Sequence, residues 1–293
     1  MKYIKRILIM CLCVFTLSGC VFKSDTMEDI EIYTTTYPIK YLVNSLYGEH
    51  STIKTIYPNG VNIDEYELSD RKINDYSNSD LLVFNSLDID RDYAVKMINN
   101  NQDLKIIDVS LGMSYDNSIE ELWLNPYNYL MMAQNVKNGL LEYVSNPYLI
   151  SNDDGTGIED KYEELKYDLS RLDANLKESI NNANYNTIVV DNDLFKYLEK
   201  YNLKVISLEE NEELNNNTID EVKQLINDNK IKYIYSVDSE TNSTAKSLID
   251  EYGLELVTIN SMRSTDGGIT NSNESYITVM NNNIDLLKKE LYK

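Results

Sequence analysis

The sequence predicts an α/β protein of two lobes, each with a four-stranded parallel sheet flanked by helices, joined by one long rigid helix. Short segments dense in Ile, Val, Leu and Tyr alternate with helical patterns, as parallel sheets with right-handed crossovers require. Four such segments precede residue 110 and four follow residue 186. Between the two sets, an apolar stripe with helical spacing extends over residues 158–183.

The strand segments are apolar along most of their length, which is typical of sheets covered by helices on both faces. The expected strands are Ile30–Thr34, Ile53–Tyr57, Leu81–Phe84 and Lys105–Val109, then Thr187–Val190, Lys204–Leu208, Ile231–Tyr235 and Leu254–Ile259. The expected helices between them are Ile39–Leu46, Asp70–Asn78, Arg91–Asn99, Asp193–Tyr201, Ile219–Asn229 and Ser243–Tyr252. Two α/β lobes follow from this order.

The central stripe predicts a helix of about 25 residues, or about 38 Å at 1.5 Å per residue. Its apolar positions are Ile158, Tyr162, Leu165, Leu169, Leu172, Leu176, Ile180 and Ala183, and they follow one another at spacings of three and four. A single stripe of this length also fits a coiled-coil seam. We favour a strut packed along both lobes, because the segment lies midway in an α/β chain.

The N-terminus has the pattern of a lipoprotein signal peptide. A positive start is followed by an apolar run over residues 7–17, too short to span a hydrocarbon core of about 30 Å as a helix. The run ends in Leu17-Ser18-Gly19-Cys20, which resembles the bacterial lipobox. The resemblance implies cleavage before Cys20 and attachment of an acyl chain, such as palmitate, to the mature protein. The alternative is an ordinary signal peptide with a chance cysteine.

These features divide the chain into five parts. We expect a signal peptide (1–19), a lipidated tether (20–29), an N-terminal α/β lobe (30–150), a linking helix (151–184) and a C-terminal α/β lobe (185–293). The protein is then a soluble body anchored by lipid to the extracytoplasmic face of the cell membrane. No other run is apolar and long enough to span a membrane.

Composition excludes several classes of function. The 293 residues include 27 Lys and Arg against 48 Asp and Glu, a formal net charge of −21, which disfavours a nucleic-acid partner. The chain has one His and three Cys, of which Cys11 and Cys13 leave with the signal peptide. Imidazole and thiolate metal sites are therefore not expected. Neither a nucleophile elbow nor a phosphate loop occurs, so we do not expect an enzyme.

Several motifs occur in an order that points to one family. After the lipobox come Thr34–Pro38, Tyr57–Glu67, Ser79–Asn85 and Leu122–Pro126, then the long helix and the second lobe. Together they resemble the metal-binding lipoproteins of ATP-binding-cassette importers, in the zinc and manganese cluster. The resemblance covers nearly the whole mature chain. It implies two lobes on a rigid helix, a metal ion in the cleft between them, and delivery of the ion to a membrane permease and its ATPase.

The resemblance also implies metal-ligand positions, at which this chain carries oxygen donors instead of the family's histidines. They are Asp64 and Glu121 at two His positions, Asn192 at a third with neighbouring Asp191 as a further candidate, Asp238 at the Glu position of manganese-type members, and Asn260 at the final Asp position. The only histidine, His50, matches no ligand position and is expected on a surface loop.

The chemistry of these residues favours a hard ion. Each candidate is expected after a strand, and the ligand crevice of an open α/β sheet lies at the carboxyl ends of its strands. Carboxylate and amide oxygens suit manganese, magnesium or calcium better than zinc. Because acidic residues are abundant, these positions also fit a degenerate site. The alternative function is then a surface interaction lipoprotein or a binder of another small solute. In either case we expect a monomer.

Overall fold

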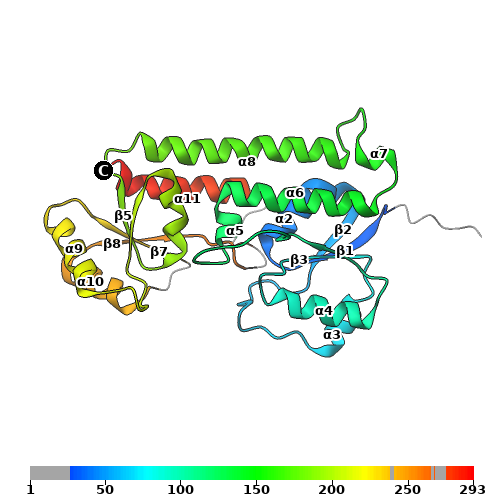
Figure 1. Ribbon diagram of the computed structural model, residues 1–293, viewed down its shortest axis with the longest axis horizontal. Coiled ribbons are helices and arrows are strands. Elements are labelled where there is room, and N and C mark those ends of the chain that lie inside the picture. Colours follow the sequence, from blue (N-terminus) through cyan, green and yellow to red (C-terminus); the bar gives the residue numbers. More distant parts are fainter. Residues whose placement is uncertain (1–26, 238–240, 265–266, 268–274) are drawn as a thin grey trace, which may run out of the picture.

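Two α/β lobes lie side by side beneath one long helix (Figure 1). The computed structural model describes residues 27–237, 241–264, 267 and 275–293. Each lobe contains a four-stranded parallel sheet, with strand order β2-β1-β3-β4 in the first and β6-β5-β7-β8 in the second. The predicted fold class is confirmed.

All eight expected strands are present. The first sheet contains β1 (Ile30–Thr34), β2 (Ser51–Thr55), β3 (Leu81–Phe84) and β4 (Lys105–Asp108). The second contains β5 (Thr187–Val190), β6 (Lys204–Ser207), β7 (Tyr233–Val237) and β8 (Glu255–Ile259). The prediction for β2 was two residues late, because Ile56 and Tyr57 are buried core residues of the loop that follows the strand. The prediction for β7 was two residues early, since buried Ile231 precedes the strand.

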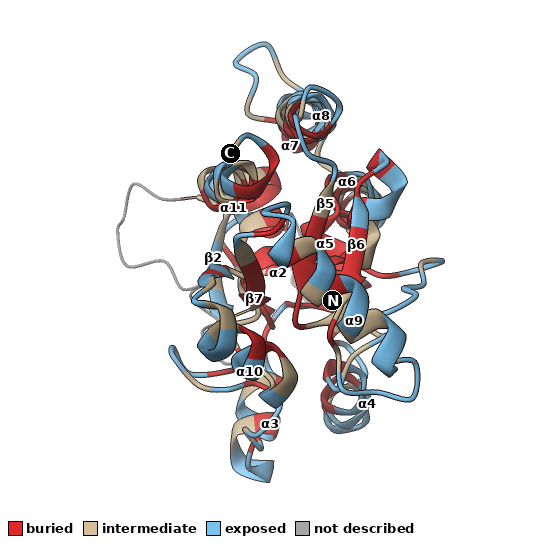
Figure 2. Cartoon of the chain, turned by 90° about the vertical axis from the view of Figure 1, so that its left-hand side faces the viewer, coloured by how far each residue is buried: buried red, intermediate tan, exposed pale blue. Residues whose placement is uncertain are grey.

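Helices cover both faces of each sheet. The first lobe contains α2 (Tyr37–Tyr47), the short 3-10 helix η1 (Gly48–His50), α3 (Asp70–Tyr76), α4 (Asp90–Asn100), α5 (Glu121–Leu124), α6 (Pro126–Tyr143) and α7 (Pro147–Ile150). The second contains the 3-10 helix η2 (Asp193–Tyr201), α9 (Asn216–Asn227), α10 (Ser243–Tyr252) and α11 (Tyr276–Leu291). Burial is concentrated on the strands and on the inward faces of the helices (Figure 2).

The long helix α8 (Ile158–Asn181) packs along both lobes. Its buried residues include seven of the eight predicted stripe positions, from Ile158 to Ile180. The helix contacts α2 and α6 of the first lobe and α11 of the second, and Figure 1 shows it running along α6 and α11. One continuous apolar cluster therefore includes residues from both lobes and from α8, as expected for a strut.

Asparagine side chains begin many of these helices. The N-cap oxygens of Asn125, Asn146, Asn192, Asn215 and Asn242 each accept a backbone N–H of the first helical turn, which satisfies donors that have no partner within the helix. Within the described residues, no helix combines the length and the apolar character needed to cross a membrane. Cys20 and the rest of the predicted signal peptide lie outside the described residues.

Candidate cation site in the inter-lobe cleft

A cavity of about 820 Å³ lies between the lobes. Loops that follow strands of both sheets form its walls. The N-terminal lobe contributes Val61, Asn62, Ile63, Asp64, Glu65, Ser118 and Glu120, and the C-terminal lobe contributes Asn192, Leu194, Val237, Thr258, Ile259, Asn260, Ser261, Arg263 and Ser264. The cavity thus lies where ligands are expected to bind, outside the carboxyl ends of the strands.

Three carboxylates surround one guanidinium group at this cavity. The Nη2 atom of Arg263 lies 2.5 Å from Oδ1 of Asp64, and its Nη1 atom donates to Oδ2 of Asp88 over 2.9 Å. Its Nε atom lies 3.4 Å from Oε1 of Glu120. All three carboxylates belong to the N-terminal lobe, whereas Arg263 follows β8 of the C-terminal lobe. A cation therefore joins the two lobes at the cleft.

The cluster is largely shielded from water. The side chains of Arg263, Asp88 and Glu120 are 15%, 10% and 14% exposed, and only Asp64 is open to solvent at 59%. Burial by itself would lower the pKa of Arg263, but the three carboxylates together raise it above its usual value. The guanidinium is therefore charged at every accessible pH. Three negative groups against one positive group leave the cluster with excess negative charge.

The loop that carries Arg263 is held by its own polar side chains. Oδ1 of Asn260 accepts the backbone N–H of Met262 over 2.8 Å, and its Nδ2 donates to the carbonyl of Gly267 over 2.8 Å. The buried side chain of Asn283 on α11 accepts the N–H of Asn260 and donates to its carbonyl. These bonds fix the backbone from which Arg263 extends.

The same loop also contacts the N-terminal lobe. The indole Nε1 of buried Trp123 donates to the carbonyl of Ser261 over 2.7 Å. The N–H of Tyr37 donates to the carbonyl of Ser264 over 3.3 Å. Gly267 has a positive φ of 65°, and a Cβ atom there would lie only 2.5 Å from the Tyr37 ring. A glycine is therefore needed where this loop crosses to the other lobe.

The candidate ligands predicted from the sequence occupy different environments. Asp64 lies in the cleft beside Arg263. Asn192 and Asn260 also line the cavity, but each side-chain oxygen already accepts a backbone N–H, from Leu194 over 2.7 Å and from Met262 over 2.8 Å. Asp238 lies outside the described residues.

Glu121 does not line the cavity. Its carboxylate accepts the backbone N–H groups of residues 116–118 and the Nδ2 of Asn117, and it is buried. Consecutive residues of a helix point about 100° apart, so only one of the two glutamates that precede Leu122 faces the cavity. That residue is Glu120. The structure therefore places Glu120, the residue before the predicted Glu121, in the cavity lining.

Asp191 is also absent from the cavity lining. It is 6% exposed, and its Oδ1 atom has no hydrogen-bond partner among the described residues. Burial raises the pKa of this carboxyl, while the hydroxyl groups of Ser236 and Thr241 act in the opposite direction. Asp191 is thus a buried residue directly after β5 that does not line the cavity.

Asp88 and Arg263 were not identified from the sequence. Asp88 lies four residues after β3, in the same kind of loop position as the predicted candidates. Arg263 is the only arginine of residues 185–293, and it lies four residues after the last strand. Their positions shortly after strands are the sequence signal that marks both residues, but this signal does not show that the two pair.

A buried carboxyl lies behind the cleft cluster. Asp90, at the start of α4, is 1% exposed, and its Oδ1 atom accepts a hydrogen bond from the hydroxyl of Tyr57 over 2.9 Å. Burial and the nearby charge of Asp88 raise its pKa to about 7. Asp90 therefore changes its protonation state near neutral pH, next to a residue that contacts Arg263.

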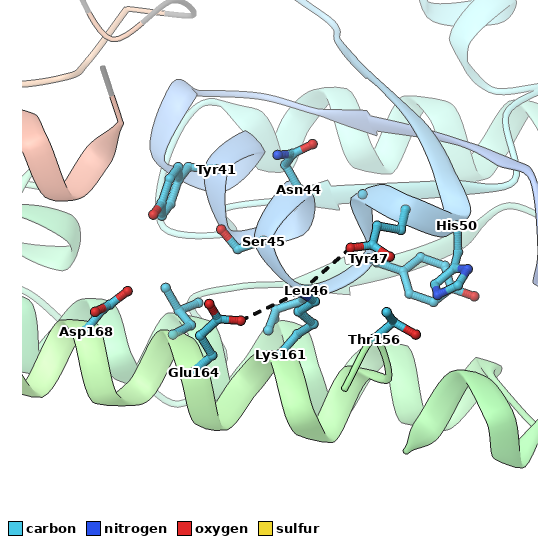
Figure 3. A pocket seen from close by; sticks show the side chains of 13 residues that line it. Tyr41, Asn44, Ser45, Leu46, Tyr47, His50, Thr156, Lys161, Glu164 and Asp168 are labelled. Carbon is cyan, nitrogen blue, oxygen red and sulfur yellow. Dashed lines mark ion pairs between the residues drawn. The ribbon is translucent and has the colours of Figure 1, made fainter. Parts of the chain in front are cut away.

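A second cavity, of about 480 Å³, lies between α2 and α8 and contains His50 (Figure 3). Lys161 lines this cavity, and its Nζ atom pairs with Glu49 at 3.7 Å and with Glu164 at 3.6 Å. The Nε2 atom of His50 is buried and has no hydrogen-bond partner among the described residues. The expectation of a plain surface loop was wrong for His50, which packs 5.5 Å from the Tyr47 ring.

Throughout the described part of the chain, no three His, Cys, Asp or Glu residues stand together as a preformed metal site. In the cleft this agrees with the geometry, since the carboxylates are arranged around the larger guanidinium group instead of around one point. The three carboxylates favour a positive group in the cleft, and in this structure that group is the guanidinium of Arg263.

Comparison with known proteins gives a consistent result. Residues 32–290 match the family model described as ZnuA, zinc-uptake complex component A, periplasmic. The chain is 22% identical to the zinc-binding lipoprotein AdcA of Streptococcus pneumoniae, over 97% of this chain and 60% of AdcA. It is also 22% identical to the iron-binding protein YfeA of Yersinia pestis, over 91% of this chain and 88% of YfeA. The chain thus spans well under two thirds of AdcA.

Solved structures share the fold. The zinc-bound ZnuA-like domain of Streptococcus pneumoniae AdcA superposes with a TM-score of 0.70 and 21% identity, covering 90% of this chain and all of that domain. The metal-dependent lipoprotein YcdH of Bacillus subtilis gives a TM-score of 0.71 and 19% identity, covering 90% of this chain and all of YcdH. At such identities the likeness establishes the two-lobe architecture alone.

Proposed function

Since this chain belongs to the family of zinc-uptake complex component A periplasmic proteins, we propose that it is the extracytoplasmic substrate-binding component of an ATP-binding-cassette importer. It captures a divalent metal ion in the inter-lobe cleft and delivers it to a membrane permease. The observation that carries this proposal is the convergence of Asp64, Asp88 and Glu120 on one cationic group at the carboxyl ends of the strands.

The ion that suits these donors is a hard one. Carboxylate oxygens bind manganese and calcium well, whereas a tight zinc site uses imidazole or thiolate ligands. Relatives of this chain are named for zinc or iron, but its only histidine lies in the other cavity. Manganese is therefore the first ion to test. The amides of Asn192 and Asn260, together with Asp238, are proposed donors from the C-terminal lobe.

A lipid anchor at Cys20 completes the proposal. One or more acyl chains would hold the protein at the outer face of the membrane near its permease. Replacing Cys20 by Ala is expected to release the protein from the membrane fraction into the soluble fraction. A variant that still sediments with membranes in high salt would contradict the anchor.

A second function is favoured by one observation. Arg263 already neutralises part of the carboxylate charge that a metal ion would neutralise. If that pairing is permanent, the protein is a family member that has lost metal binding. It would then act as a surface interaction lipoprotein or bind another small solute.

Metal content and thermal shift separate the two functions. The protein is purified without a metal-affinity tag, analysed for bound elements, and melted with manganese, calcium or zinc. An ion at 100-fold excess over its Kd should add about 2.7 kcal/mol to the free energy of unfolding. Absence of any shift with every divalent ion would favour loss of metal binding.

Paired variants locate the site. Replacing Asp64 by Asn together with Glu120 by Gln should abolish the manganese shift while the metal-free protein stays folded. The matched control replaces the exposed Asp75 by Asn and Glu163 by Gln and should keep the shift. If the cleft variant keeps its shift, the ion binds elsewhere.

A further inference from the structure

We propose that Arg263 is a built-in competitor for the metal ion: its guanidinium occupies the cation position of the empty cleft, and the ion enters by displacing it. This inference rests on the proposed function and concerns the regulation of that same site. It makes Arg263 the residue that sets how tightly the cleft holds its ion.

The contacts indicate that the two cations exclude each other. All three guanidinium nitrogens of Arg263 are engaged by carboxylates of the N-terminal lobe: Asp64 accepts from Nη2 and Nε, Asp88 accepts from Nη1 and Nη2, and Glu120 lies 3.4 Å from Nε. A divalent ion coordinates oxygens at about 2.0–2.6 Å, so it needs the same oxygens that Arg263 now engages. Two positive groups sharing this shielded space would also repel each other. The ion therefore takes the place of Arg263 instead of binding beside it.

The route of exchange follows from the exposure of the partners. Asp64 is the one carboxylate of the cluster that is mostly exposed, at 59%, while Asp88 and Glu120 are nearly enclosed. An arriving ion meets Asp64 first and can take over that carboxylate while Arg263 still holds the other two. The guanidinium then leaves toward the open cavity of about 820 Å³.

The fixed position of its loop explains why Arg263 competes effectively. The loop backbone is fixed by the side chain of Asn260 and by the Trp123 bond to Ser261, so the guanidinium stays close to the carboxylates at a high effective concentration. Because Arg263 stays protonated, raising the pH does not release it. Another cation, or movement of the lobes, can take it out of the cluster.

Isothermal titration of the full chain with manganese chloride, and separately with calcium chloride, tests this inference on three variants and the wild type. Arg263→Gln removes the competing charge and is expected to lower the Kd by about tenfold or more, since a charge-assisted contact no longer has to be broken. Arg263→Lys keeps a weaker, single-point competitor and should lie between Gln and the wild type. Arg171→Gln, at an exposed pair with Asp168 on α8, is the matched control and should equal the wild type.

A metal-free measurement accompanies the titration. Amide hydrogen exchange of the Arg263→Gln variant in chelator should accelerate in residues 62–66 and 86–89, because their link to the C-terminal lobe is lost. A circular dichroism melt verifies that this variant is folded, and Arg263→Lys provides the same comparison if it is not.

Each outcome has one meaning. Tighter binding by Arg263→Gln than by the wild type supports the inference. If the wild type fails to bind while Arg263→Gln binds, the proposed function of the natural protein fails, and Arg263 is shown to be the cause. Equal or weaker binding by the variant, with a binding wild type, overturns the inference and leaves the proposed function standing. Failure of every variant to bind overturns both.

Discussion

The two lobes repeat one architecture and differ in the charge that they bring to the cleft. Their sheets have equivalent strand orders, and both place loops at the same cavity. The N-terminal lobe contributes Asp64, Asp88 and Glu120, whereas the described part of the C-terminal lobe contributes Arg263 and the neutral amides of Asn192 and Asn260. A shared fold therefore does not give shared site chemistry.

The difference extends to what each side chain is bonded to. The C-terminal amides are used within their own loops, since Asn192 caps η2 and Asn260 braces the Arg263 loop. The N-terminal carboxylates are instead paired with a side chain from the other lobe, and a side chain can be exchanged. In this structure the N-terminal lobe thus supplies the carboxylates at the cleft, and the C-terminal lobe supplies the cationic group that they bind.

The largest loss of stability is expected from interrupting α8, the helix that packs on both lobes. Replacing Leu169, fully buried in the middle of α8, by Pro should cost about 5 kcal/mol or more: about 3 for the helix interruption and at least about 2 for the lost side chain. The measurement is thermal unfolding. The volume-conserving Leu169→Met should cost less than about 1.5 kcal/mol. An unchanged melting temperature for the Pro variant would show that α8 does not support both lobes.

The stability of the N-terminal lobe is expected to depend on pH through the buried carboxyl of Asp90. Since Asp90 has a pKa raised to about 7, the folded protein keeps this proton to higher pH than the unfolded chain. Its contribution to stability is present below about pH 4, falls between about pH 4 and 7, and totals up to about 4 kcal/mol. Asp90→Asn should therefore unfold with a flatter pH dependence than the wild type and be more stable above pH 7. Parallel pH profiles would show that Asp90 ionises normally.

The contact between the lobes at the Arg263 loop is weakened by Trp123→Phe. This change removes the buried Nε1 bond to the Ser261 carbonyl and should cost about 1–3 kcal/mol, because the carbonyl loses its partner. Chemical denaturation provides the value, and Tyr127→Phe, at an exposed ring, is the control. A loss no larger than that of the control would mean that the loop is held by its own side chains alone.

The smallest effect is expected on the surface of α8. Arg171→Gln removes an exposed pair with Asp168 and should change the free energy of unfolding by less than about 0.5 kcal/mol. A larger loss would show that surface charge, and not the buried stripe, stabilises the helix.

The fold could be predicted from the sequence because strands and helices are indicated by the hydrophobic pattern of neighbouring residues. The strand segment Leu81–Phe84 is apolar throughout, Thr187–Val190 is apolar after its first residue, and the α8 stripe has one period over its whole length. The errors at β2 and β7 arose because buried residues such as Tyr57 continue beyond the ladder. Hydrophobicity locates the core but does not determine which residues pair.

The site was less predictable because it depends on contacts between distant segments. Asp64 lies where it was expected, but the choice between Glu120 and Glu121 depends on the first turn of α5. Arg263 meets Asp64 across 199 positions of sequence, so no local pattern reveals the pairing. The family's metal-ligand positions also do not include Arg263, because this residue is not itself a metal ligand.

Anomalous diffraction from crystals grown with manganese chloride would locate the bound ion and show whether it exchanges with Arg263. We predict a manganese peak within coordination distance of Asp64, Asp88 and Glu120, with the Arg263 side chain moved out of the cluster toward the cavity. A peak elsewhere in the molecule, or no peak with Arg263 still paired to the three carboxylates, would contradict the exchange of one cation for the other.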